Sequence, residues 1–138
     1  MATSMFESIL GTVTPEMTQS LGARLGESPS AVQHGLSSAT AATLSGLARN
    51  TSDPGFIDRL MQVVNRAGSQ NVAGNVASAI SAGPSGAAGE LGNRLSSLVF
   101  GTQQGQIGNL VAQHSGLSST AGSGILKMAG ALVLGHFV

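Results

Sequence analysis

The sequence predicts a single all-α domain of about six to seven helices with an internally duplicated helical hairpin. Apolar residues recur at helical spacing, helix starts with Ser, Thr and Pro recur, and the alternation typical of strands is nearly absent. A chain of 138 residues suits one core and is too short for two ordinary domains. The expected parts of residues 1–138 are a first hairpin at about 15–48, middle helices at about 53–100 and a second hairpin at about 105–137.

The composition limits the classes of function. Only 9 % of the residues are charged, against roughly 25 % in an ordinary soluble domain, and six basic residues balance six acidic ones. Nucleic-acid binding usually needs a basic stripe, which the scattered cations do not form, so we expect no nucleic-acid partner. The absence of cysteine excludes disulfides and thiolate metal sites. A nearly neutral surface has little repulsion between copies and favours self-association.

The N-terminal residues predict a short amphipathic helix between Ser4 and Gly11. Positions 11–14 separate this segment from the first hairpin, so it could dock within the chain or swap onto a neighbouring subunit. It lacks the basic and apolar runs of a secretory signal, and we expect a cytoplasmic protein. The apolar side chains on its candidate interface are Met5, Phe6, Ile9 and Leu10.

The first hairpin has a start pattern for each of its two helices. Thr14-Pro15-Glu16 combines an N-cap, a proline in the first turn and an acid that complements the helix dipole. This short helix ends at Gly26. Ser28-Pro29 repeats the start pattern for a longer helix that ends near Asn50. The apolar face of the longer helix consists of Val32, Leu36, Ala39, Thr43 and Leu47.

The middle of the chain predicts helices separated by glycine-rich breaks. Ser52 or Asp53 caps a helix that stops at Gly68, and a weak helix follows at 71–82. Residues 83–86 are the most linker-like point of the chain. The two stronger helices carry apolar stripes at Phe56, Leu60, Val63 and Val64, and at Leu91, Leu95, Leu98 and Val99.

The C-terminal part predicts a polar loop at 101–105 and then the second hairpin. Ser118 or Ser119 starts its long helix, which contains the most apolar stretch, 125–138. That stretch is shorter than the ~20 residues needed to span a bilayer, which favours a buried helix over membrane contact. The apolar side of the short helix consists of Ile107, Leu110, Val111 and His114.

A shift of 89 residues aligns the two hairpins without a gap. Apolar phase and turn position agree as well as residue identities, and we interpret the match as an αα-hairpin used twice. Chance matching among Ala, Gly and Ser is the alternative. In this alignment His114 and His136 occupy the positions of leucines, which predicts packing roles for both histidines.

Glycines inside the long helices predict close helix contacts. Glycine costs about 1 kcal/mol relative to alanine in a helix, so it is expected where two backbones approach. We expect the two long helices to pack on each other near a pseudo-twofold axis, with Gly130 at a close contact. The candidate packing or interface glycines are Gly35, Gly46, Gly124, Gly130 and Gly135.

The order of these elements resembles a known bacterial family. The residues that carry the resemblance are Ser-Pro-Ser-Ala-Val at 28–32, Ala-Ala-Thr-Leu-Ser-Gly-Leu-Ala-Arg-Asn at 41–50, a glycine-rich middle, and His-Ser-Gly-Leu-Ser at 114–118. They are similar to the domain-of-unknown-function family 937, the group related to YidB-like proteins, over most of the chain. The resemblance implies an all-helical fold and no accepted catalytic residues.

No catalytic, cofactor-binding or metal-binding pattern stands out. None of the three histidines has a second histidine or a carboxylate three or four residues later, as helical metal motifs require. Asp53 and Asp58, the closest carboxylates, suit helix-start and surface roles. Gly122-Ser123-Gly124 follows no strand and lacks the third glycine of a dinucleotide loop. We therefore expect no enzyme, no cofactor and no metal.

These features favour a non-enzymatic structural or interaction protein. Its expected partner is itself, in a homo-oligomer or filament built through apolar, small-residue-rich helix faces. The alternative is a binding module for an apolar ligand, a peptide or a membrane surface, in a groove between the hairpins.

Overall fold

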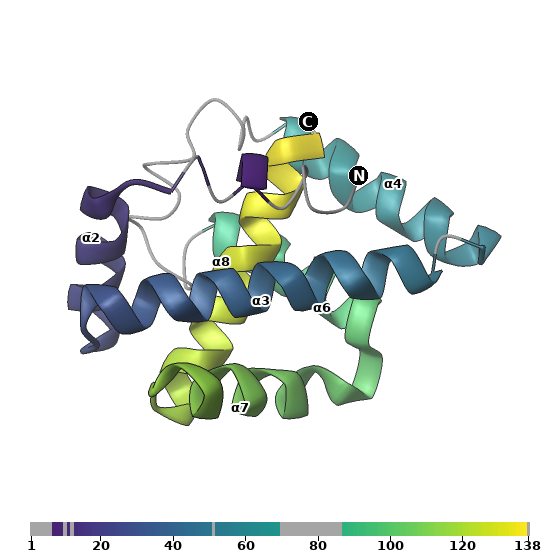
Figure 1. The fold of residues 1–138 in the computed structure, drawn as a ribbon. Helices are drawn as coiled ribbons and strands as arrows, with labels where there is room; N and C mark the ends of the chain where they lie inside the picture. Colours follow the sequence, from purple (N-terminus) through teal and green to yellow (C-terminus); the bar gives the residue numbers. More distant parts are fainter. Residues whose placement is uncertain (1–6, 10, 12, 51, 70–86, 138) are drawn as a thin grey trace.

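The computed structural model describes residues 7–137 except 10, 12, 51 and 70–86, and these residues form helices without any strand (Figure 1). The predicted all-α fold class is therefore confirmed. The helices are α2 (Pro15–Leu25), α3 (Pro29–Asn50), α4 (Pro54–Ser69), α6 (Ala87–Phe100), α7 (Gln104–Ser115) and α8 (Ser119–Phe137), with the 3-10 turn η2 (Gly101–Gln103) between α6 and α7.

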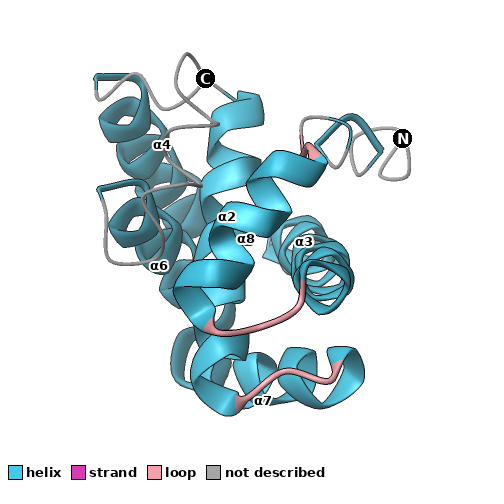
Figure 2. Cartoon of the chain, turned by 90° about the vertical axis from the view of Figure 1, so that its left-hand side faces the viewer, coloured by secondary structure: helices cyan, strands magenta, loops and turns pink. Residues whose placement is uncertain are grey.

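Helix α8 is the centre of the fold. Helices α3, α6 and α7 all pack against it, and α4 packs mainly on α6 (Figure 2). Met128, Ala129 and Val133 of α8 are fully buried. A helix surrounded by other helices must be apolar on almost every side, because each face meets a neighbour. The described side chains of the most apolar stretch, 125–134, thus lie in a buried helix, as predicted.

The helix starts follow the predicted local chemistry. The Thr14 side chain accepts a hydrogen bond from the Met17 N–H (3.2 Å) and caps α2. Of the two predicted caps for α4, Asp53 makes a bond, since its carboxylate accepts from the Gly55 N–H (3.0 Å). All five residues predicted for the apolar face of α3 are buried. Local capping and apolar spacing are therefore sufficient to define α2, α3 and the start of α4.

The two hairpins close with the same turn. Gly26 and Gly116 end α2 and α7 in the left-handed conformation, with φ of 70° and 73°. Each donates its N–H to the carbonyl of the residue four positions earlier. Ser28 and Ser118 then cap α3 and α8, because each hydroxyl oxygen accepts from the N–H three residues later (3.2 and 3.1 Å). The duplicated hairpin is present in the structure.

These turns correct the offset of the repeat from 89 to 90 residues. The glycine and serine of each turn differ by 90 in number, whereas the sequence comparison aligned the hairpins at 89. The long helices are so rich in Ala, Gly and Ser that the sequence comparison selected the wrong offset. At 90, His114 corresponds to Arg24, and both are exposed. The predicted packing role of His114 is therefore wrong, and the side chain of His136 lies outside the described part.

The predicted polar loop at 101–105 is also wrong. Gly101 has a φ of 58°, which lets the chain pass from α6 through η2 directly into α7. Gln104 holds the junction, because its side-chain oxygen accepts from the Ser97 hydroxyl (2.8 Å) and its amide donates to Asn93 (2.7 Å). Side-chain bonds between neighbouring helices replace the loop. The helix predicted at 71–82 and the linker at 83–86 lie outside the described residues.

Candidate functional site

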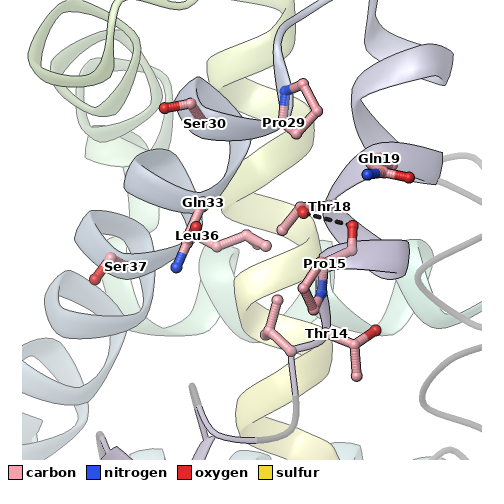
Figure 3. A pocket seen from close by; sticks show the side chains of 10 residues that line it. Thr14, Pro15, Thr18, Gln19, Pro29, Ser30, Gln33, Leu36 and Ser37 are labelled. Carbon is pink, nitrogen blue, oxygen red and sulfur yellow. Dashed lines mark hydrogen bonds between the residues drawn. The ribbon is translucent and has the colours of Figure 1, made fainter.

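A cavity of about 340 Å³ lies between the start of α2 and the first half of α3 (Figure 3). Thr18 and Leu36 face each other across it, and the Thr18 hydroxyl already donates to the Pro15 carbonyl (2.8 Å). None of the described residues that line this cavity is charged. It therefore offers uncharged hydrogen-bonding groups and apolar surface, without the paired carboxylates or histidine of an acid–base site.

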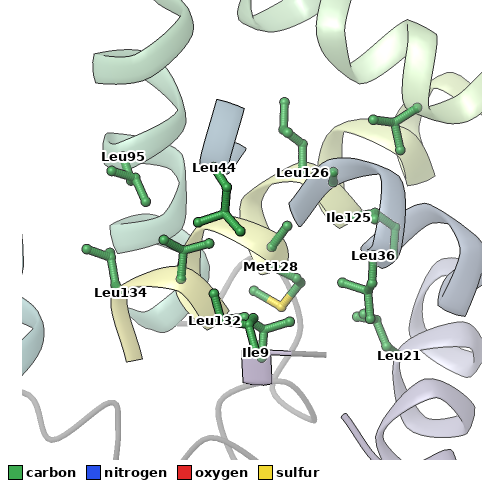
Figure 4. Close-up of a cluster of buried hydrophobic side chains, with 14 of the residues drawn as sticks. Ile9, Leu21, Leu36, Leu44, Leu95, Ile125, Leu126, Met128, Leu132 and Leu134 are labelled. Atoms are coloured by element: carbon green, nitrogen blue, oxygen red, sulfur yellow. The ribbon is translucent and has the colours of Figure 1, made fainter. Parts of the chain in front are cut away.

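The N-terminal interface candidates are described at one position only. Ile9 is 1 % exposed and packs in the chain's own core beside Met128 and Leu132 of α8 (Figure 4). Of the two predicted arrangements, docking of the N-terminal segment within its own chain is the one seen at Ile9. The other three candidates, Met5, Phe6 and Leu10, lie outside the described residues.

Helices α6 and α8 touch through backbone at a pair of glycines. A Cβ added at Gly130 would lie 2.6 Å from the Gly92 carbonyl oxygen and 2.9 Å from its Cα, and a Cβ at Gly92 would meet the Lys127 carbonyl oxygen. Gly130 was expected against the other long helix, α3, and this expectation is wrong. Gly92 was not among the predicted contact glycines, because it lies in α6, outside the repeated hairpins.

The other candidate glycines are Gly35, Gly46, Gly124 and Gly135, and two of them lie at close contacts within the chain. A Cβ at Gly35 would lie 2.8 Å from Leu117 of the second turn, and one at Gly46 would meet Val99 of α6. Gly124 is buried in α8, and the surroundings of Gly135 lie outside the described part. Where their surroundings are described, these glycines meet neighbouring parts of the same chain and are not free for a partner.

The acidic and histidine side chains that the structure describes do not converge. Within the described ranges, no three His, Asp or Glu residues are close enough to hold a metal ion. Glu90 and Arg94 form an ion pair on the exposed face of α6 (3.4 Å). His34 and His114 are both exposed on different helices. The described surface therefore provides no cluster from which to derive a reaction.

An open apolar groove lies between α3 and α7, where the two hairpins meet. It has a volume of about 630 Å³, and Leu110 at its edge is 59 % exposed. The other large apolar side chain at least half exposed in the described part is Met61 on α4, at 50 %. The groove is lined by Ser38, Ala42, Ile107, Leu110, Val111, Gln113 and His114.

The helices that form this groove carry almost no charge. Helix α7 has no Asp, Glu, Lys or Arg, and α3 has only Arg49, in its last turn. A partner that covers the groove would not have to strip water from a charged group there, which is the main penalty on burying a surface. Depletion of charged residues is also the compositional feature of interface centres.

At position 110 the second hairpin carries a leucine where the first hairpin carries a serine. At the offset of 90, the exposed residues Glu16, Ser20 and Arg24 of α2 correspond to Gln106, Leu110 and His114 of α7. We call the second set the α7 stripe. All six positions are exposed, yet the α7 stripe replaces two charges by neutral groups and a serine by leucine. Spacing placed Leu110 and His114 on the apolar side of α7, and the structure exposes both of them.

Comparison with known proteins places the chain in a family. The model of a family described as bacterial protein of unknown function (DUF937) matches residues 7–137. The chain belongs to the DUF937 family. The resemblance inferred from the sequence is thereby confirmed. No curated protein and no solved structure matches this DUF937 chain.

The helices of the DUF937 chain were also compared with the requirements of a membrane span. In the part that the structure covers, no single helix has both the length and the hydropathy to cross a bilayer. One pair, Gly89–Ser115 with Ser119–Leu134, meets the length and hydropathy limits together, with a bend of 107° between its halves.

Proposed function

We propose that this DUF937 protein is a non-enzymatic interaction protein that self-associates, and that the α3–α7 groove is its contact surface. The observation that carries the proposal is Leu110, which is 59 % exposed beside an uncharged groove, whereas the corresponding residue of the first hairpin is Ser20. Leu110 is continuous with the apolar side chains of the groove, and an exposed apolar patch of this kind supports an interaction surface.

The energetics support association through this surface. Full burial of a leucine side chain contributes about 1.5–3 kcal/mol, so covering the exposed part of Leu110 contributes about 1–2 kcal/mol per copy. The chain has zero formal net charge, so long-range repulsion does not oppose contact between two copies. Because the contact is apolar, we expect added salt to leave it unchanged or to strengthen it, whereas an ionic contact would weaken.

The test is the molar mass of the full chain as a function of concentration, by light scattering and sedimentation. We expect the mass to rise above that of one chain and Leu110→Ser to raise the Kd by on the order of tenfold or more. Met61→Ser is the matched control, since it removes an equally large exposed side chain from another helix, and it should associate as the wild type does.

Two results would contradict the proposal. The first is a chain that remains monomeric at high concentration, and the second is Leu110→Ser associating as strongly as the wild type. If the monomer instead binds a hydrophobic dye in a manner that lipid vesicles or an apolar peptide compete with, the alternative of an apolar binding module is favoured.

A further inference from the structure

The order of side chains in the α7 stripe fits one partner better than others. Gln106, Leu110 and His114 are spaced by four residues, so they form one ridge along the helix with the leucine at its centre. We infer that the occupant of the α3–α7 groove is α7 of a second copy, running antiparallel, with Leu110 on a two-fold axis. This inference rests on the proposed self-association and adds its geometry.

The stripe is self-complementary in the antiparallel direction. Reversal about Leu110 brings Leu110 of both copies together and places Gln106 of each copy opposite His114 of the other. A carboxamide and a neutral imidazole each have a donor and an acceptor, so these two groups can form a hydrogen bond at both ends of the contact. Antiparallel helices also oppose their dipoles, whereas a parallel pair would align them.

The groove beside the ridge allows the two copies to interlock. Ile107 and Val111 form the next row on α7, and Ala42 of α3 forms the opposite wall. A ridge of residues spaced by four fits the groove beside the equivalent ridge of another helix, which is the commonest mode of helix packing. Under a two-fold axis each copy contributes one ridge and one groove. The two copies therefore satisfy each other, and no equivalent surface is left over for a third copy.

The other exposed apolar residue suits such a contact less well. Met61 lies on α4, away from α7 (Figure 1), and two charged exposed residues, Asp58 and Arg59, precede it within one turn. Burying Met61 in the groove of a second copy would bring these charges toward an uncharged surface and remove water from them. Helix α7 itself contains no Asp, Glu, Lys or Arg, which favours a closed dimer over a head-to-tail filament at this surface.

The absence of cysteine from the sequence allows this geometry to be tested by single-cysteine variants and a short bis-maleimide linker. We expect Leu110→Cys to form a linked dimer by itself at protein concentrations above the Kd that the loss of the leucine raises. Gln106→Cys and His114→Cys should link several-fold more when mixed and allowed to exchange than either variant does alone. Ser20→Cys is the matched control at the equivalent position of α2 and should not link. Circular dichroism checks that each variant is folded.

The possible outcomes separate this inference from the proposed function. If Gln106→Cys and His114→Cys each link alone as well as in the mixture, the antiparallel arrangement is refuted. Linking of Leu110→Cys to Met61→Cys in place of itself would refute the two-fold axis. If light scattering shows association while no cysteine of the α7 stripe links, only the geometry fails. If the wild-type chain is monomeric, the proposed function fails as well.

Discussion

Replacement of Gly130 by alanine tests whether backbone contact between α6 and α8 holds the centre of the fold. The added Cβ would lie 2.6 Å from the Gly92 carbonyl oxygen, about 0.8 Å inside the distance at which ordinary van der Waals contact begins. The obstacle is backbone in the middle of a helix, which cannot rotate away as a side chain can. The two helices must therefore separate, and α8 carries contacts with α3 and α7 as well.

The expected loss of stability follows from two opposing effects. Overpacking a well-packed core costs about 1–3 kcal/mol, and a rigid backbone obstacle places Gly130→Ala near the upper end. Alanine recovers about 1 kcal/mol of helix propensity. The net destabilisation is about 2 kcal/mol, which for a chain of this size lowers the Tm by roughly 6–8 °C.

The assay is urea and thermal unfolding followed by far-UV circular dichroism at low protein concentration. Gly105→Ala is the control, because a Cβ at Gly105 has nothing within 4 Å in the first turn of α7. That variant should be neutral or stabilised by up to about 1 kcal/mol. A Gly130→Ala variant as stable as the wild type would refute the reasoning, since the propensity gain would then have no opposing clash.

Two further substitutions test particular backbone and polar features. Thr40 is fully buried, and its hydroxyl has no hydrogen-bond partner among the described residues, so Thr40→Val should raise the free energy of unfolding by about 1 kcal/mol; a lower urea midpoint would show that the hydroxyl is bonded. Gly116→Ala forces a side chain into a φ of 73° and should destabilise the chain by about 1–2 kcal/mol. An unchanged midpoint for Gly116→Ala would argue against the left-handed turn.

Much of the fold could be predicted because it depends on local chemistry. Thr14, Ser28 and Asp53 begin helices through bonds to backbone groups two or three residues away, and such bonds are set by the adjacent sequence. The apolar face of α3 follows from spacing alone. The predicted offset of 89 residues was wrong because only a few turn residues define the true offset of 90. The many Ala, Gly and Ser residues of the long helices match almost equally well at either offset.

The candidate surface was beyond prediction because the inward face of α7 is defined by a glycine. Spacing placed Leu110 with Ile107 and Val111 on one apolar side, but a Cβ at Gly108 would lie 3.1 Å from the Ser123 hydroxyl oxygen of α8. The helix therefore rests on α8 through its glycine, Val111 points inward, and Leu110 is turned outward. A pattern of apolar residues gives no weight to glycine, so it cannot show that Gly108 is the point of contact with α8.

The sparse charge of the sequence has two separate causes, and only one of them is the fold. Helix α8 lacks charge except at Lys127 because neighbouring helices surround it. Burial does not explain the few charges of α3 and α7, because each of these helices exposes a face to solvent. Gln33 and Ser45 lie on the exposed face of α3, and Gln106 lies on that of α7. Helix α2, which corresponds to α7 in the repeat but packs mainly on α3, keeps Glu16 and Arg24. A helical hairpin can therefore carry charge at these positions, and the neutrality of α7 is what the proposed contact surface predicts.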